Sequence, residues 1–407
     1  MTQIAVIGAG ITGVTTAYAL ARRGARVTLI EQQRYPAMET SYANGGQLSA
    51  SNAEVWMHRS MILKGLRWML RKDAPLLVNP IPGWHKLSWL VEFLSAMPHY
   101  RDHTQASVRL ALAAREYLYA WAEEAGVEFD LRREGILHIY RNRADFERAE
   151  AVNRLLNEAG LERHAVTPEE MKSLEPALTE AYYGGFYTAS DASGDIHKFT
   201  CALAQAAAER GVETCFNTRV DQARANGVDV DLWLDQAGQV HRRHFDQVVI
   251  CAGTASRALA AQLGDRVNVY PVKGYSLTLT LENALSQAAA PQMSLLDEAH
   301  KLVCSRFGDT RLRVAGTAEF NGFNRDIRAD RIAPLIDWVE RCFPAVNTRT
   351  RVPWAGLRPM MPDMMPRVGP GKQPGVYYNT GHGHLGWTLS AITAEMVAAQ
   401  VDTPKEG

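Results

Sequence analysis

The sequence predicts a two-domain chain that mixes α/β and α+β architecture, and three observations support this fold class. The 407 residues exceed what one hydrophobic core usually supports. The first 31 residues follow the order strand, glycine turn, helix, strand. Between residues 270 and 320, three segments alternate apolar and polar side chains as antiparallel strands do. We therefore expect a parallel α/β domain joined to an antiparallel sheet.

The N-terminal segment QIAVIGAGITGVTTAYALARRGARVTLIE begins the α/β domain. Gly8, Gly10 and Gly13 form a GxGxxG pattern, in which the first glycine permits a tight turn and the second lets backbone approach a pyrophosphate. The third lets the following helix, expected over 14–23, pack closely on the strand. Glu31 ends the second strand, where a carboxylate accepts hydroxyls of an adenosine ribose. This combination predicts a Rossmann-like site for a dinucleotide.

An acid at position 31 disfavours a ribose 2′-phosphate and hence NADP, which leaves NAD and FAD. The next segment, ETSYANGGQLSASN, consists of small polar residues and suits an extended path beside a long ligand, although an ordinary surface loop has the same composition. A second strand and glycine turn, FDQVVICAGTAS, places Gly253 for another close backbone approach. The domain is thus interrupted and resumed, which favours FAD.

Composition excludes several functions. Lys plus Arg and Asp plus Glu number 44 each, so no global charge attracts a nucleic acid. The five cysteines are widely spaced and form no CxxC, which indicates thiols in a reducing compartment. The N-terminus lacks the features of an export signal, and no run of 18 apolar residues predicts a membrane span. We expect a cytoplasmic protein and no nucleic-acid partner.

Residues 61–95 combine Trp, Met and Leu with Lys and Arg. Such a segment can lie on a membrane surface, at the inner face of the cell membrane. More often one face of the stripe packs in the core and the other meets solvent, and we favour this second interpretation.

Seven segments, found along nearly the whole chain, resemble those of D-amino acid dehydrogenases of the small-subunit type, within the wider glycine oxidase and D-amino acid oxidase group of flavoenzymes. They are VIGAGITGVTTAYALARRG, ETSYANGGQLS, LKGLRWMLRKDAPL, YPVKGYSLT, TRLRVAGTAEFNGF, WAGLRPMMPDMMPRVG and NTGHGHLGWTLS. The resemblance implies a Rossmann-like FAD-binding domain, an antiparallel-sheet substrate domain, FAD bound without a covalent link, and oxidation of an amine next to a carboxylate. The expected FAD-binding domain comprises 1–60, 190–265 and 350–407, and the substrate domain comprises 61–189 and 266–349.

The resemblance also implies roles for individual residues. Arg358, in GLRPMMPD, matches the arginine that pairs with the substrate carboxylate, and a planar guanidinium suits such a bidentate contact. Tyr275 and His300 are expected on the substrate side, His300 standing where relatives often carry a tyrosine. A structural arginine in a strand and an ordinary strand histidine are the alternatives.

The loop GHGHLGWT is expected to lie against the flavin, with backbone N–H groups and the amino end of the next helix stabilising charge on the ring. Its histidines lack a third ligand nearby, so no metal is expected. The full set of expected FAD contacts is Gly8, Gly10, Ile11, Thr12, Gly13, Glu31, Gln32, Ser41, Asn44, Gly45, Gly46, Gln47, Leu48, Val220, Gly253, Gly383, His384, Leu385, Gly386, Trp387 and Thr388.

The function expected from this pattern is FAD-dependent oxidation of a D-amino acid or a small cyclic imino acid. Hydride would pass from Cα to flavin N5, the imino acid would hydrolyse to a 2-oxo acid and ammonia, and a quinone or another electron carrier would reoxidise the flavin. Three alternatives remain at this point: an oxygen-using oxidase of glycine or sarcosine type, a flavin-bearing subunit without turnover, and an NAD-dependent dehydrogenase. The sequence does not determine the oligomeric state.

Overall fold

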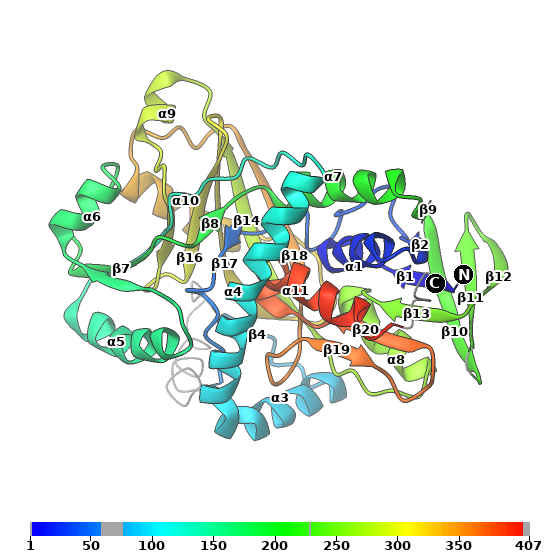
Figure 1. The fold of residues 1–407 in the computed structure, drawn as a ribbon. Helices are drawn as coiled ribbons and strands as arrows, with labels where there is room; N and C mark the ends of the chain where they lie inside the picture. The colour runs from blue at the N-terminus through cyan, green and yellow to red at the C-terminus, as the bar shows by residue number, and fades with distance from the viewer. Residues whose placement is uncertain (1, 58–75, 228, 402–407) are drawn as a thin grey trace.

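The computed structural model describes residues 2–57, 76–227 and 229–401. Two sheets organise these residues, one of six strands and one of nine (Figure 1). The six-stranded sheet lies at the end of the molecule where the N-terminus is found, and the nine-stranded sheet stands beside it (Figure 1). This arrangement agrees with the predicted mixed fold.

The six-stranded sheet is parallel except at one edge. Its order is β19-β20-β13-β1-β2-β9, and only β19 runs antiparallel to its neighbour. Because parallel strands point the same way, the residues that follow β1, β2, β13 and β20 meet at a single edge. The strands are β1 (Gln3–Ile7), β2 (Arg26–Ile30), β9 (Glu213–Cys215), β13 (Gln247–Ile250), β19 (Arg367–Pro370) and β20 (Val376–Thr380).

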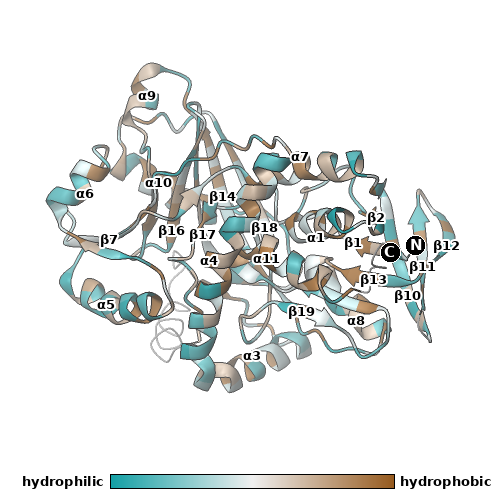
Figure 2. Cartoon of the chain, in the orientation of Figure 1, coloured by the Kyte–Doolittle hydropathy of each residue, from teal (hydrophilic) through white to brown (hydrophobic). Residues whose placement is uncertain are grey.

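Helices cover one face of this sheet and a small sheet covers the other. The apolar side chains of α1, α7, α11 and α4 pack together on the helical face, whereas β10, β11, β12 and α8 cover the opposite face. Hydrophobic residues dominate the central helix α11 (Figure 2). This helix packs against α1 and α4. These elements are α1 (Ile11–Arg22), α4 (Tyr100–Glu124), α7 (Ile196–Glu209), α11 (Gly386–Ala398), β10 (Thr218–Asn226), β11 (Asp229–Gln236), β12 (Gln239–Phe245) and α8 (Ser256–Gln262).

The nine-stranded sheet has the order β18-β14-β17-β16-β15-β5-β7-β6, with β4 added beside β17. Most neighbours are antiparallel, and the pairs β15–β5 and β17–β4 are parallel. The three segments expected as antiparallel strands are β14, β16 and β17, so that prediction is confirmed. The strands are β4 (Leu76–Val78), β5 (Ile136–Tyr140), β6 (His164–Val166), β7 (Gly184–Thr188), β14 (Tyr270–Thr280), β15 (Ser294–Asp297), β16 (Leu302–Phe307), β17 (Arg311–Phe320) and β18 (Arg351–Met360).

Short elements complete the described chain. Strands β3 and β8 form a two-stranded sheet, and α10 packs on β14 and β17. The remaining elements are β3 (Gln47–Leu48), β8 (Ala192–Ser193), α3 (Trp84–Ala96), α5 (Arg143–Glu158), α6 (Pro168–Leu174), α9 (Ala284–Ala289), α10 (Ala329–Cys342) and the 3₁₀ turns η1 (Met97–His99), η2 (Gly253–Ala255) and η3 (Gly383–Leu385).

The expected division into two domains stays a prediction, but the pairing of strand β18 is relevant to the boundary placed at residue 350. The expected FAD-binding domain includes the residues from 350 onward, yet β18 pairs along its length with β14 of the nine-stranded sheet. Thus 351–360 belong structurally with the sheet expected to bind substrate. The backbone hydrogen bonds of a ladder decide this membership, and they are invisible in a local sequence pattern.

Helix α3 has two apolar faces. Trp89 is buried and donates its indole N–H to the Met360 carbonyl at 2.9 Å, whereas Trp84 is 81% exposed. Residues 61–75 of the predicted membrane-contact segment, 61–95, lie outside the described residues. Within the part of the chain that the structure describes, no helix is both long and apolar enough to cross a bilayer.

Candidate functional site

The carboxyl edge of the parallel sheet gathers the expected dinucleotide residues. Gly8 follows β1 with φ +100°, and a Cβ there would lie 2.7 Å from the Cys251 carbonyl oxygen, directly after β13. A Cβ on Gly13 would overlap the Gly8 carbonyl oxygen. Gly10 differs, because a Cβ there would meet only the Ser41 hydroxyl oxygen, at 3.5 Å. Gly8 and Gly13 therefore permit close packing against neighbouring backbone, whereas Gly10 leaves space in front of helix α1.

Helix α1 begins at this space. Its first residue, Ile11, donates its backbone N–H to Ser41 Oγ at 3.0 Å, and the Thr12 carbonyl accepts the Thr16 hydroxyl at 2.6 Å. The N-cap residue, Gly10, has no side chain to cap the remaining N–H groups. A helix end with accessible N–H groups and a positive dipole is suited to a pyrophosphate.

Glu31 lies at the end of β2, beside the glycine turn. Its carboxylate accepts the Ala9 N–H at 2.7 Å and the Gln33 N–H at 2.9 Å. Burial raises the pKa of Glu31, and these backbone donors oppose that shift. The side chain is thus held in place where the ribose of a dinucleotide is expected.

A polar hollow of about 410 Å³ adjoins this position. Gln32 contributes to its wall; Val220, in β10, does not, although its neighbour Arg219 does. The hollow is lined by Gln32, Gln33, Glu39, Asn217, Arg219, Asp235, Ala237, Gly238 and Arg325. The hollow presents hydrogen-bonding groups near the position expected for the adenosine.

We expect Glu31→Ala to lower FAD occupancy strongly while leaving the turnover of FAD-loaded enzyme nearly unchanged. Charge-assisted hydrogen bonds to the ribose contribute about 1.5–3 kcal/mol, far from the reacting ring. The measurement is the ratio of flavin to protein absorbance after purification. Glu213→Ala serves as the matched control, because Glu213 is an exposed residue of β9 paired with Arg243. Equal occupancy in the two variants would remove Glu31 as the ribose ligand.

The segment after Ser41 packs against the nine-stranded sheet and is not an ordinary surface loop. A Cβ on Gly45 would overlap Val303, and one on Gly46 would overlap the Phe307 ring. Asn44 Oδ1 accepts the Gly46 N–H at 2.9 Å, and Gln47 donates to Ser294 Oγ at 2.9 Å. Leu48 is buried in β3. Close packing therefore holds this backbone against strands of the nine-stranded sheet.

The C-terminal loop contacts Met360 and the segment that contains Asn52 and Trp56. Gly383 has φ +59°, and a Cβ there would lie 2.6 Å from the Met360 sulfur. His384 stacks on Trp56 with ring centroids 5.0 Å apart and contacts the Asn52 carbonyl at 3.1 Å through Nε2. Burial lowers the pKa of His384 to about 4, so the ring is neutral near pH 7.

The rest of the loop packs in the interior. Leu385 and Trp387 are buried, Gly386 is the first residue of α11, and the Thr388 hydroxyl accepts the Ser49 N–H at 3.2 Å. Gly253 begins η2 with φ +53°, and no atom lies within 4 Å of a Cβ placed there. Of the loop residues, His384 reaches the large cavity described next.

A cavity of about 550 Å³ opens between the nine-stranded sheet, residues 40–56 and helices α4 and α5. Arg358 stands in its wall and donates through Nη1 to the Thr317 carbonyl at 2.8 Å. Gly274, on the adjacent strand, leaves the space that the guanidinium fills, because a Cβ there would overlap it. Burial alone lowers the pKa of Arg358 to about 10, so the group stays cationic near pH 7.

No carboxylate among the described residues pairs with Arg358. A buried cation without a counter-ion is costly unless a ligand supplies the charge. The cavity wall beside it includes Asn44, Gly45, Gly46 and His384, which belong to the expected cofactor segments. Arg358 and those segments, predicted from distant parts of the chain, therefore meet at one cavity.

The two other expected catalytic residues have different positions. Tyr275 lines the cavity, but its hydroxyl donates to Glu319 Oε2 at 2.8 Å, and burial raises its pKa. His300 is absent from the cavity lining. Its Nδ1 lies 3.0 Å from Asp297 Oδ2, and Arg341 donates to its Nε2 at 3.1 Å. The role expected for His300 on the substrate side stays a prediction, and its neighbours Glu298 and Lys301 line the cavity.

Sequence reasoning missed most of the charged groups in the cavity. Glu54, His138, Glu298 and Lys301 line it, from three separate segments. His138 and Tyr140 alternate along β5 and so share one face, a signal present in GILHIY. Their relation to Glu298 follows only from the pairing of β5 with β15, in which His138 lies opposite Leu296.

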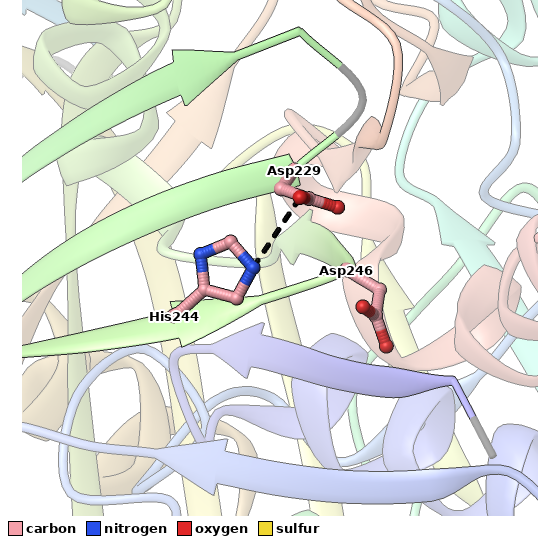
Figure 3. Close-up of side chains that lie close together, drawn as sticks. All are labelled: Asp229, His244 and Asp246. Carbon is pink, nitrogen blue, oxygen red and sulfur yellow. Dashed lines mark ion pairs between the residues drawn. The ribbon is translucent and has the colours of Figure 1, made fainter.

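A separate group of potential metal ligands lies on the small sheet, at the end of the molecule away from the cavity. Asp229, His244 and Asp246 bring their ligand atoms within 4.8 Å of one another (Figure 3). His244 already contacts Asp229 Oδ2 at 3.4 Å and Asp231 Oδ1 at 3.3 Å, and Asp246 accepts the Gln3 N–H at 2.5 Å. These ion pairs and the hydrogen bond to the Gln3 backbone explain why the three side chains lie close together.

Comparisons with known proteins agree with this geometry. A family model described as FAD dependent oxidoreductase matches residues 3–400. The chain is 56% identical to D-amino acid dehydrogenase 3 of Mesorhizobium japonicum, covering 99% of this chain and 98% of the relative. It is 40% identical to the D-amino acid dehydrogenase of Dechloromonas aromatica, with coverage of 99% and 98%.

Among solved structures, glycine oxidase from Geobacillus kaustophilus aligns with a TM-score of 0.77 at 21% identity, covering 99% of this chain and 96% of that one. L-proline dehydrogenase from P. horikoshii aligns with a TM-score of 0.75 at 17% identity, covering 99% and 95%. These likenesses show the fold. The protein belongs to the DAO family of FAD-dependent oxidoreductases.

Proposed function

We propose that this protein is a D-amino acid dehydrogenase that uses FAD. The observation that carries the proposal is Arg358, a cation without a carboxylate partner among the described residues, in the wall of a cavity that the expected flavin-binding segments also line. The names of its relatives support the same substrate class.

The described residues fit FAD. Gly10 leaves room at the amino end of α1, Glu31 is held at the ribose position, and the backbone of Gly45 and Gly46 is exposed to the cavity. We assign the cofactor-binding role to the residues predicted from the sequence, with Arg358 as the substrate ligand. When bound, FAD supplies the acceptor for the hydride that leaves Cα of the substrate.

The protein's part in the reaction is binding and orientation. Arg358 pairs with the α-carboxylate and fixes the substrate in the cavity, so that Cα has one orientation. The amine must be neutral to expel hydride, and the neutral His384 in the wall adds no positive charge next to it. The imino acid then leaves the site and hydrolyses in water to a 2-oxo acid and ammonia.

The test is anaerobic bleaching of the flavin spectrum by a panel of D-amino acids, L-amino acids, D- and L-proline, glycine and sarcosine. We expect purified protein to be yellow, to release FAD on acid treatment, and to be bleached by D-amino acids. Bleaching by glycine or sarcosine alone would favour the oxidase alternative. A flavin that no amine or imino acid reduces, although dithionite does, would contradict the proposal.

We further propose that the electrons pass to a quinone or a similar carrier. The same panel supplies the measurement, because bleached enzyme can be mixed with oxygen or with a soluble quinone. We expect reoxidation by the quinone to be the faster. Faster reoxidation by oxygen would make the protein an oxidase.

We propose that this electron transfer takes place while the protein is bound to the surface of a membrane. Large exposed apolar side chains recur at helical spacing on one face of α3, at Trp84, Leu87, Val91 and Leu94, and Ile81 is exposed just before the helix. Trp84 is 81% exposed and Val91 66% exposed, so this face is not covered by other described residues. Such a face can enter the headgroup layer of a bilayer.

Substituting Trp84 and Val91 together by serine is expected to reduce binding to phosphatidylcholine–phosphatidylglycerol vesicles by about tenfold or more, since two apolar side chains no longer leave water. Flotation of the purified protein with vesicles measures the bound fraction. Val240→Ser is the matched control, because Val240 is an exposed valine on β12 of the small sheet. Equal flotation of all three proteins would rule out a contact through α3.

A further inference from the structure

Arg358 reaches its place in the cavity by crossing a neighbouring strand. Its backbone lies opposite Val272 in the ladder between β18 and β14, yet its guanidinium lies over Gly274, where a Cβ would come within 2.4 Å of it. Beyond Gly274 the guanidinium meets β17, where it donates to the Thr317 carbonyl at 2.8 Å. The side chain therefore lies across β14 and joins the two strands on either side of it.

The bond to Thr317 is the only hydrogen bond that Arg358 makes with the described residues. Arg306, another buried arginine of the same sheet, donates to three backbone carbonyls. Since a guanidinium has several further N–H donors, the remaining edge of Arg358 is available to a ligand in the cavity. The orientation of the group, however, depends on a single acceptor.

A β-bulge directs this acceptor. A register shift interrupts the ladder between β14 and β17 at Gly274. Two residues of β17, Thr317 and Ala318, stand opposite this single glycine, which defines the bulge. In a regular antiparallel ladder, carbonyl groups point within the sheet to a neighbouring strand. The bulge releases the Thr317 carbonyl from this pattern, so that it can accept from the side chain lying over Gly274.

Threonine is an unfavourable residue at this position for two reasons. Thr317 has φ +64°, and a branched side chain is strained in the left-handed region, where such bulges usually carry glycine. Its hydroxyl oxygen is also buried without a hydrogen-bond partner in the part of the chain that the structure describes. Strain of this kind persists only where the surrounding structure enforces it, and it is frequent at functional sites.

Taking Arg358 as the carboxylate ligand, as in the function proposed above, we propose that the bulge at Thr317 positions Arg358. The Thr317 carbonyl holds one edge of the guanidinium across Gly274, and the other edge is thereby presented to the substrate carboxylate. Thr317 is a positioning residue, because it acts through Arg358 and takes no part in bond breaking. Its backbone conformation performs this role, and its hydroxyl is not required.

Deleting Thr317 tests the role of the bulge directly. The pairs on either side, Gly316 with Tyr275 and Glu319 with Lys273, can remain as they are. We expect kcat/KM for the best amino acid to fall by about 10- to 100-fold, mostly through KM, as loss of a well-oriented charge-assisted bond implies. The decarboxylated amine of the same substrate should keep its kinetic constants within about twofold, since it has no carboxylate to place.

Gly274→Ala displaces Arg358 from the same position without altering the bulge. The new Cβ would overlap the guanidinium, which can move because it ends a flexible side chain, and Gly274 has no positive φ. We expect a similar rise in KM for the amino acid, little change for the amine, and a Tm close to that of the parent. This variant decides the matter even if the deletion variant does not fold.

Thr317→Gly keeps the carbonyl and adopts a left-handed φ without strain. We expect a KM within about threefold of the parent and a Tm at least as high. Thr280→Gly is the matched control, because Thr280 is the exposed last residue of β14 and has no positive φ, so glycine should lower the Tm there. Thr317→Val removes the hydroxyl alone and should also keep the parent KM.

A KM in Gly274→Ala equal to that of the parent would overturn the inference, because Arg358 would then work from another position. An equal loss for amino acid and amine in the deletion and Gly274→Ala variants would overturn it as well, since that indicates general damage. A raised KM in Thr317→Val would assign the role to the hydroxyl instead, and a lowered Tm in Thr317→Gly would contradict the strain.

The parent protein separates these results from a failure of the proposed function. If D-amino acids bleach its flavin and it prefers the amino acid to the decarboxylated amine, the dehydrogenase function stands, and the results above remove only the positioning role of Thr317. If the parent shows no such preference, the carboxylate role of Arg358 fails, and the inference fails with it.

Discussion

Replacing Arg358 with alanine is expected to lower kcat/KM for the best amino acid by roughly thirtyfold to several thousandfold, since loss of a buried charge partner costs about 2–5 kcal/mol. The substrate carboxylate would enter a cavity from which its cation is missing. Arg358→Lys keeps the charge but loses the planar fork, and we expect an intermediate value. Steady-state kinetics of the parent and both variants measure the effect.

Two controls separate loss of substrate binding from general damage. Arg351→Ala removes an exposed arginine of the same strand, whose guanidinium contacts only the Thr348 carbonyl among the described residues, and it should retain normal kinetics. The decarboxylated amine of the best substrate should be a poor substrate of the parent enzyme and lose little more in Arg358→Ala. The variant should also keep its FAD and remain reducible by dithionite. Near-normal turnover of the amino acid by Arg358→Ala would remove the carboxylate assignment, and the amino acid function with it.

Gly13→Ala is expected to prevent FAD binding and to destabilise the protein itself. The new Cβ would overlap the Gly8 carbonyl oxygen, which is backbone and cannot rotate away. Overpacking of this kind costs about 1–3 kcal/mol and sometimes more. Thermal melting of FAD-free protein should therefore show a lower Tm, and flavin absorbance should be nearly absent after purification.

Gly10→Ala is the matched comparison, because the same methyl group meets only the Ser41 hydroxyl, at 3.5 Å, and Gly10 has an ordinary φ of −71°. The FAD-free variant should melt like the parent, whereas its affinity for FAD should fall, since the methyl group occupies space expected for the pyrophosphate. If Gly10→Ala binds FAD normally, the cofactor does not approach α1 as proposed. If the Tm of Gly13→Ala equals that of the parent, the backbone of the turn can shift enough to accommodate the new methyl group, and the expected destabilisation is wrong.

The local sequence was sufficient to predict the glycine turn and the acidic residue at the carboxyl edge of the parallel sheet. Gly8, Gly13 and Glu31 lie within one strand–helix–strand unit, and the contacts of Gly13 with Gly8 and of Glu31 with Ala9 join residues close together in the chain. Because each role depends on backbone geometry that neighbouring residues enforce, the pattern alone predicts it. The alternating segments at β14, β16 and β17 were predictable for a similar reason, since side-chain alternation reports a strand directly.

The substrate side could not be predicted in this way. His300, Glu298 and Lys301 are neighbours in sequence, yet only the last two face the cavity, while His300 turns to Asp297 and Arg341. Lys301 has φ +54°, and this left-handed residue at the turn after β15 reverses the chain and redirects the side chains around it. A one-residue change of direction of this kind leaves no periodic signal.

The sequence by itself determined the fold class, the dinucleotide turn and, through resemblance, the family and the candidate arginine. The tertiary structure alone decided which residues share the cavity with that arginine, because Glu54, His138 and Lys301 come together only through the loop anchored by Asp191 and the order of strands β5, β15 and β16. Strand order and register depend on the packing of the whole sheet rather than on any local pattern. Arg358 was identifiable because its motif is contiguous, whereas the charged end of its cavity is built from segments about 250 residues apart and exists only in the folded chain.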